Sequence, residues 1–328
     1  MQAFIWGLIA AFIIGILLGP KVIPMLIKLK FGQTIYDLGP EAHKVKQGTP
    51  TMGGIIFAVP MVLVPVVGFL FGQISVKVVM VLISTVGFGL IGFLDDYIKV
   101  SKKRSLGLTP MQKIVPQFVL SLVLSVWAYF TEGIGSGLVV PFTGYLWNIG
   151  WVYIPVMVFV LVGTVNSANL LDGVDGLLGG CSFIDFITMG AVCLLLGDGD
   201  LELTLFCGAA AGAGMAFLNF NTHPAKVFMG DTGSFIIGGA LVGLTMVTRT
   251  SLLLPLIALA MLVSSLSDII QVGWFKITKK KYGAGRRIFR MAPLHHHFEL
   301  GGMAETNIVM MYRSVTVVLC LLALLTFC

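Results

Sequence analysis

Asn166-Ser-Ala-Asn-Leu-Leu-Asp-Gly-Val-Asp-Gly176 joins two apolar runs near the middle of the chain. Each run is close to the roughly 20 residues that cross a bilayer as a helix. A carboxylate at membrane depth costs roughly 2.5–3.5 kcal/mol, so two acids at the end of a span predict a polar site. If the stretch is helical, Asn169, Asp172 and Asp175 share one face. Its glycines favour instead a break that lets the backbone approach a ligand, and a plain solvated loop is a third interpretation.

The composition around this stretch is that of a membrane protein. Of 328 residues, 57% are hydrophobic and 11% are charged, which excludes a soluble domain. The 40 glycines suit close helix packing in lipid. We therefore expect an all-α polytopic membrane protein, with residues 1–328 forming one catalytic domain of about ten spans. The expected spans are 3–24, 53–72, 76–94, 114–131, 146–165, 177–196, 202–218, 234–250, 252–275 and 305–327.

The basic residues separate the loops into two alternating sets. One set holds most of the lysines and arginines, and the other holds only Lys77 and Arg249. Loops rich in Lys and Arg stay in the cytoplasm, so the first set is expected to be cytoplasmic. An even number of spans then places both termini outside the cytoplasm. The net charge of +6 is read first as this topology signal.

The polar motifs gather on the cytoplasmic side of this predicted topology. A transporter usually places polar groups near the bilayer midplane and opens to both faces. Polar motifs at one face indicate an enzyme that meets a water-soluble substrate there. An ion-coupled transporter that uses Asp185 and Asp268 remains an alternative. The expected active-site segments are about 28–52, 95–113, 166–176, 219–233 and 276–304.

Gly48-Thr-Pro-Thr-Met-Gly-Gly54 opens the second expected span. The free N–H groups of a helix start, with Lys44 and Lys46 nearby, could hold an anion. A simple N-cap with proline in the first turn explains the same residues. On this motif alone, the N-cap is the simpler interpretation.

Phe93-Leu-Asp-Asp-Tyr-Ile-Lys99 ends the third expected span. Adjacent carboxylates repel, so either Asp95 or Asp96 has a raised pKa and acts as a base, or both face a cation. Lys99 and Lys113 could neutralise phosphate. Positive-inside loops rarely place two acids at the membrane edge, so the pair favours function over structure.

Phe228-Met-Gly-Asp-Thr-Gly-Ser234 places Asp231 among glycines at a helix start. A carboxylate in such a place suits Mg²⁺, which keeps several waters and binds substrate phosphates. A plain N-cap role for Asp231 is the alternative. Phe228 could stack on a planar base or simply pack at the interface.

Three consecutive histidines, His295, His296 and His297, follow three arginines in the longest cytoplasmic loop. A regular helix cannot point all three at one metal, and the absence of a nearby cysteine disfavours zinc. Imidazoles beside arginines suit phosphate binding.

These motifs occur together, and in this order, in one family. Gly-Thr-Pro-Thr-Met-Gly-Gly, Phe-Leu-Asp-Asp-Tyr, Asn-Leu-Leu-Asp-Gly-Val-Asp-Gly-Leu, Phe-Met-Gly-Asp-Thr-Gly-Ser and Met-Ala-Pro-Leu-His-His-His-Phe-Glu resemble those of the bacterial phospho-N-acetylmuramoyl-pentapeptide transferases, or translocase I. The aspartate motifs alone would indicate only the wider polyprenyl-phosphate N-acetylhexosamine-1-phosphate transferase superfamily. The triple-histidine motif is the specific part.

The resemblance implies a Mg²⁺-dependent reaction in peptidoglycan synthesis. Phospho-MurNAc-pentapeptide would pass from UDP-MurNAc-pentapeptide to undecaprenyl phosphate, giving lipid I and UMP. A relative that uses UDP-GlcNAc is the alternative with the same chemistry. The family also implies a homodimer in the bacterial plasma membrane, with its active site facing the cytoplasm.

The resemblance also implies roles for residues. Asp231 would bind magnesium, and one of Asp95 and Asp96 would be a base at the acceptor. Phe228 would stack on uracil, and the three histidines would contact the sugar diphosphate. The expected catalytic residues are Asp95, Asp96, Asp231, His295, His296 and His297. The expected substrate-binding residues are Lys44, Lys46, Thr51, Lys99, Lys113, Asn169, Asp172, Asp175, Asn221 and Phe228.

Overall fold

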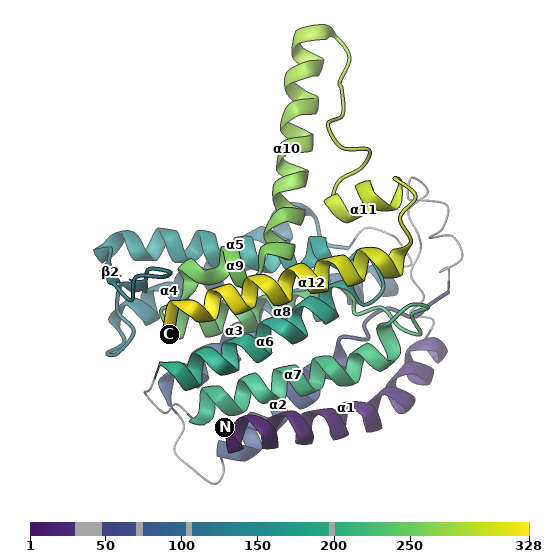
Figure 1. Ribbon diagram of the computed structural model, residues 1–328. Helices are drawn as coiled ribbons and strands as arrows, with labels where there is room; N and C mark the ends of the chain where they lie inside the picture. The colour runs from purple at the N-terminus through teal and green to yellow at the C-terminus, as the bar shows by residue number, and fades with distance from the viewer. Residues whose placement is uncertain (30–47, 70–74, 103–106, 197–200, 328) are drawn as a thin grey trace.

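A computed structural model describes residues 1–29, 48–69, 75–102, 107–196 and 201–327. Long helices lie side by side in one bundle, and a single helix, α10, projects from it (Figure 1). The elements are α1 (Gln2–Lys28), α2 (Ile55–Phe69), α3 (Val76–Ser101), α4 (Pro110–Phe130), β1 (Gly137–Val139), β2 (Leu146–Asn148), η2 (Gly150–Val152), α5 (Tyr153–Leu171), α6 (Leu177–Leu195), α7 (Leu201–Asn221), α8 (Gly230–Val247), η3 (Ser251–Leu253), α9 (Leu254–Ile257), α10 (Leu259–Tyr282), α11 (Leu294–Glu299), α12 (Glu305–Leu324) and η4 (Leu325–Phe327).

The bundle confirms the expected all-α membrane architecture. In the described part of the chain, eight helices are long and apolar enough to cross a membrane. A ninth candidate is the pair 251–257 and 259–282, and α2 is a shorter apolar helix. The expected number of ten would follow if the broken pair and α2 each cross once.

The expected span 146–165 is wrong at its start. Residues 146–148 form strand β2, which pairs antiparallel with β1. Gly144 and Gly150 flank this strand with φ of +64° and +59°, a backbone that glycine adopts without strain. The helix therefore begins later, at Tyr153, and continues to Leu171.

The expected span 252–275 is not one continuous helix. It is broken at Ala258, whose φ of −107° and ψ of 32° lie outside the helical region. The two parts meet at 85°, and α10 then continues to Tyr282. The expected loop 276–304 therefore contains the end of α10 and the short helix α11.

Glycines let the helices of the bundle approach closely. A Cβ at Gly212 of α7 would overlap the backbone of Leu8 in α1. A Cβ at Gly92 of α3 would likewise overlap the carbonyl of Asp231 in α8. Small residues at helix contacts are typical of packing in lipid. The second contact brings the acidic end of α3 against the start of α8.

Candidate active site

Three carboxylates meet where the end of α3 reaches the start of α8. Asp95 and Asp96 come from the last turns of α3, and Asp231 comes from the first turn of α8. One oxygen from each lies within 4.8 Å of the others. Asp95 and Asp96 are fully buried. Two sequence motifs 135 residues apart thus form one cluster.

Asp96 caps α8. Its Oδ2 accepts hydrogen bonds from the backbone N–H (2.8 Å) and the hydroxyl (2.7 Å) of Thr232, and its Oδ1 accepts one from the N–H of Asp231 (3.2 Å). An acid at a helix N-terminus satisfies free N–H groups and interacts favourably with the helix dipole. The N-cap role considered for Asp231 therefore belongs to Asp96, and the side chain of Asp231 is left to the cluster.

Two lysines lie among the carboxylates. Lys99 Nζ is 2.6 Å from Asp95 Oδ2 and 3.1 Å from Asp231 Oδ2. Lys113, from α4, is 3.1 Å and 2.7 Å from the same two atoms. If all three carboxylates were ionised, the two ammonium groups would leave one formal negative charge in the cluster. That net negative charge would attract a further cation.

The donor set fits a hard cation. Carboxylate oxygens are the ligands that Mg²⁺ prefers, and it usually takes one or two of them together with substrate phosphates. A cation between the acids would release Lys99 and Lys113 from their ion pairs. Both ammonium groups would then be available to bind phosphate.

The stretch 166–176 is helical only to Leu171, because Asp172 follows as the C-cap of α5. Asn169 lies on that helix and donates to Asp231 Oδ1 (2.9 Å) and to Ser234 (2.9 Å). Asn169 therefore belongs to the carboxylate cluster. Asp172 and Asp175 lie in the turn that follows, so the stretch has the break that its glycines favour, and the three residues do not share one helical face.

The pKa of Asp172 is raised well above its ordinary value. Burial is the main cause, followed by the charges of Asp231, Asp96 and Asp175. Removing a carboxylate from water disfavours its charged form, and neighbouring negative charges act in the same direction. A hydrogen-bond donor or cation beside Asp172 would relieve this cost.

Asp175 lies in a second polar cluster. Its Oδ2 accepts from the N–H of Ala225 (3.0 Å) and lies 3.2 Å from His223 Nδ1. Glu305, at the start of α12, accepts from the N–H of Asp175 (2.8 Å). Asn221 also holds this turn, since its Oδ1 accepts from the N–H of Gly176 (3.0 Å). These contacts fix the turn after α5 to the loop after α7 and to α12.

Two of the three histidines, His295 and His296, reach this turn from α11. His295 is fully buried, and a Cβ at Gly173 would overlap its ring. His296 Nδ1 lies 2.9 Å from Glu299, and His297 Nδ1 accepts from the N–H of Arg290 (3.1 Å). Gly173, which the sequence predicted to permit close approach to a ligand, permits the close approach of α11.

The remaining expected residues lie around the start of α8 or outside the described residues. Thr51 is buried, and a Cβ at Gly230 would meet both Thr51 Oγ1 and the carboxylate of Asp96. The backbone N–H of Phe228 donates to Pro50 (2.9 Å), and the side chain is half-buried. The expected anion-binding residues Lys44 and Lys46 lie outside the described residues.

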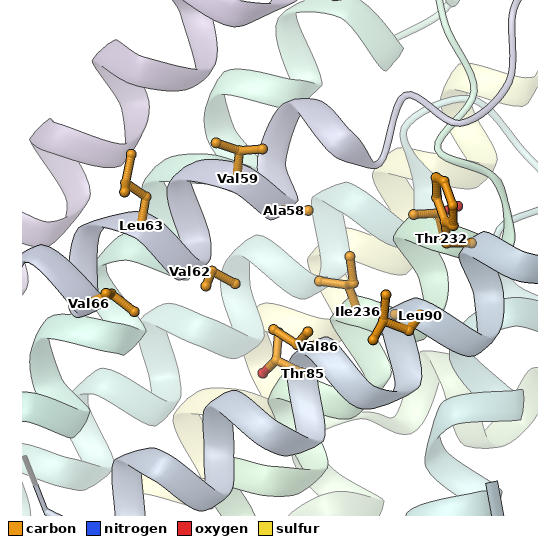
Figure 2. Close-up of a pocket in the computed structure, with 12 residues that line it drawn as sticks. Ala58, Val59, Val62, Leu63, Val66, Thr85, Val86, Leu90, Thr232 and Ile236 are labelled. Carbon is orange, nitrogen blue, oxygen red and sulfur yellow. The ribbon is translucent and has the colours of Figure 1, made fainter. Parts of the chain in front are cut away.

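An apolar pocket of about 410 Å³ lies between α2 and α3 (Figure 2). Ile236 and Thr232 of α8 line it, and Thr232 is the residue that hydrogen-bonds to Asp96. The other lining side chains are nearly all aliphatic, such as Val62 and Leu90. Such a pocket offers little to a nucleotide or sugar, so we place no polar substrate there.

Sequence reasoning missed His223, Glu305 and Ser234 as partners of site residues. Glu305 lies 130 positions from Asp175 and opens a span as an ordinary first-turn acid. Nothing local distinguishes it. Of the alternative transporter residues, Asp185 is buried in α6 beside the thiol of Cys320 (3.8 Å), apart from the carboxylate cluster.

Carboxylates and lysines lie together at one end of an apolar helix bundle. Such a site suits a cation and anionic substrates at a membrane surface. A model of glycosyl transferase family 4 matches residues 78–249, which include α3, α5 and the start of α8. More than half of the chain is covered, so the class is that of a membrane-embedded transferase. A signature of phospho-N-acetylmuramoyl-pentapeptide-transferase matches residues 46–57.

Full-length relatives identify the particular family. A phospho-N-acetylmuramoyl-pentapeptide-transferase of Heliobacterium modesticaldum is 44% identical, over 99% of this chain and 98% of its own length. One of Clostridioides difficile is 44% identical over 94% and 93%. One of Bacillus licheniformis is 42% identical over 98% and 97%. The chain belongs to the phospho-N-acetylmuramoyl-pentapeptide-transferase family.

Proposed function

We propose that this protein transfers phospho-MurNAc-pentapeptide from UDP-MurNAc-pentapeptide to undecaprenyl phosphate, giving lipid I and UMP. The observation that carries the proposal is the cluster of Asp95, Asp96 and Asp231 with two lysines at one end of an apolar bundle. Transfer between two phosphates needs alignment and charge neutralisation more than covalent help. Family membership supplies the identity of donor and acceptor.

We assign Mg²⁺ as the metal, with Asp231 as its ligand. When bound, it would neutralise charge on the phosphoryl oxygens. Asp231 shares its cluster with both lysines, and Asn169 orients it through a hydrogen bond of 2.9 Å. Lys99 and Lys113 would bind the phosphates of acceptor and donor.

Asp95 is better placed than Asp96 as the base. Asp96 uses both carboxylate oxygens to cap α8. Asp95 directs Oδ2 at Lys99 and Lys113, where an acceptor phosphate would bind. It would therefore take the proton of an acceptor phosphate held by the lysines.

The donor would bind along the turn after α5. Asn169, Asp172, Asp175 and Asn221 would line its nucleotide side, with Phe228 stacking on uracil. The three histidines would face the sugar diphosphate, and His295 and His296 lie against the same turn at Gly173. A multi-pass protein with this site at the cytoplasmic face of the bacterial plasma membrane would admit nucleotide from water and acceptor from lipid. We also expect a homodimer, which cross-linking in membranes would test.

Radiolabelled transfer tests the proposal. Purified protein is incubated with undecaprenyl phosphate and either labelled UDP-MurNAc-pentapeptide or labelled UDP-GlcNAc, with Mg²⁺ or with EDTA. Labelled lipid and UMP should form only from UDP-MurNAc-pentapeptide with Mg²⁺. Transfer from UDP-GlcNAc alone would assign the protein to the other substrate. Unchanged transfer in EDTA would show that the reaction does not need Mg²⁺.

A further inference from the structure

α10 forms an arm that leaves the bundle (Figure 1). We name residues 269–290 the basic arm: the outer part of α10 and the segment that returns along it. Gln271 holds the two together, since its Oε1 accepts from the N–H of Ile288 and of Phe289, both at 3.0 Å. Thr278 Oγ1 accepts from the N–H of Arg286 (2.8 Å). The arm is thus a preformed unit.

The arm carries an exposed apolar face. Ile269 is 67% exposed and Ile277 is 60% exposed, and Ile270 is also exposed. At 100° per residue these three side chains lie on one side of the helix, away from the side that Gln271 and Thr278 fix to the return segment. Trp274 is exposed beside them. Large exposed apolar patches mark protein or membrane contacts.

The end of the arm is strongly basic. Six exposed cations gather there, with no acid between residues 269 and 298 of the sequence. Two of them, Lys281 and Arg286, lie over the ring of Tyr282, at 5.2 Å and 5.0 Å from its centroid. The cations are Lys276, Lys279, Lys280, Lys281, Arg286 and Arg287.

An apolar face with a basic end is the pattern of helices that lie in a membrane interface. The arm joins the bundle beside α11, and Arg290 at its base donates its N–H to His297. It therefore lies at the end of the bundle that holds the histidines. In the topology of the proposed function, that end faces the cytoplasmic leaflet, where anionic lipids attract basic segments.

We propose that the basic arm binds anionic phospholipid headgroups of the cytoplasmic leaflet, with its apolar face in the acyl chains. The proposal rests on the proposed function only for the side of the membrane. Each lysine near an anionic surface favours binding by roughly fivefold. The arm would therefore surround itself with anionic lipid close to the site.

Trp274 reports directly on the lipids around the arm. The other four tryptophans are changed to phenylalanine, and the protein is reconstituted in phosphatidylcholine vesicles. The vesicles contain either brominated phosphatidylglycerol or brominated phosphatidylcholine at the same mole fraction. Quenching of Trp274 should be at least severalfold stronger with the brominated anionic lipid, and the difference should shrink between 50 and 500 mM salt. Equal quenching by both lipids would overturn the proposal.

Two triple variants distinguish an effect of the basic arm on lipid preference from an effect of the protein's net charge. Lys279→Gln/Lys280→Gln/Lys281→Gln should remove most of the preference for brominated phosphatidylglycerol. Lys28→Gln/Lys102→Gln/Lys226→Gln removes three exposed lysines outside the arm and should keep it. Equal loss in both variants would assign the effect to net charge, against the arm.

The source of the anion is tested with inorganic phosphate at constant ionic strength. Loss of the preference in phosphate would indicate a free-anion site and overturn a headgroup site. Formation of UMP is measured in every sample. An arm variant that forms UMP normally yet keeps its lipid preference contradicts this proposal alone, whereas a wild type that forms no UMP contradicts the proposed function alone.

Discussion

At the residue scale, a substitution at Asp231 tests metal binding independently of folding. Asp231→Asn keeps the size of the side chain but removes the charge that faces two lysines. We expect transfer to fall by at least about 10²-fold, with loss of the Mg²⁺-dependent gain in thermal stability. The control is Asp185→Asn, which removes a buried carboxylate away from the cluster. Near-normal turnover in Asp231→Asn would exclude it as the ligand.

Phe228 tests the nucleotide pocket. Phe228→Ala should weaken UMP binding by about 1–3 kcal/mol if the ring stacks on uracil, by analogy with base stacking elsewhere. Titration calorimetry with UMP measures the change. Phe228→Tyr keeps an aromatic ring and should restore most of the affinity. If the alanine variant binds UMP as the wild type does, Phe228 is a packing residue.

Asp172 links the site to pH. The pKa of the Asp172 carboxyl is raised in the folded protein. The folded protein therefore binds a proton there more tightly than the unfolded chain, in which the pKa of an aspartate is about 3.9. This carboxyl therefore lowers stability as pH rises above that value. Asp172→Asn is uncharged at every pH, so its gain in melting temperature should grow between pH 4 and 8, by on the order of a few degrees. Scans in EDTA measure this gain, and a pH-independent difference would contradict it.

Two glycines test packing at the scale of helices. Gly92→Ala and Gly212→Ala would each push a Cβ into the backbone of a partner helix. Such overlaps cost about 1–3 kcal/mol of folding free energy, so both variants should have a lower melting temperature than the wild type. Only Gly92 lies against Asp231, so only Gly92→Ala should also lower kcat, by about tenfold or more for the folded fraction. An equal loss of kcat in both variants would mean that general stability, and not the α3–α8 contact, controls turnover.

The ends of the membrane-spanning helices could be predicted from sequence better than the contacts between helices. Asp95, Asp96 and Asp231 were recognisable because acids at the end of apolar spans are costly and therefore informative. The break at Ala258 was not, since alanine is a good helix former and the flanking residues remain apolar. The contact between Glu305 and Asp175 joins residues 130 positions apart, and its pattern on α12 is that of an ordinary helix start. Tertiary packing alone brings them together.

At the scale of the whole molecule, the site and the termini lie at opposite ends of the bundle. α12 begins at Glu305, which contacts the turn after α5, and runs to the end where Thr326 accepts from the N–H of Phe142 in the β1–β2 hairpin. The N-terminus lies at that same end (Figure 1). A membrane around the bundle therefore separates the hairpin and both termini from the carboxylates.

The distribution of charge predicts the side of the membrane on which the site lies. Exposed lysines such as Lys102 lie at the end of the bundle that holds the carboxylates, and basic loops stay in the cytoplasm. In intact cells, a membrane-impermeant maleimide should label Thr143→Cys in the hairpin but not Lys102→Cys, and inside-out vesicles should reverse the result. The four described native cysteines are buried and give little background. Labelling of Lys102→Cys from outside would reverse the orientation and place the carboxylates where no cytoplasmic nucleotide could reach them.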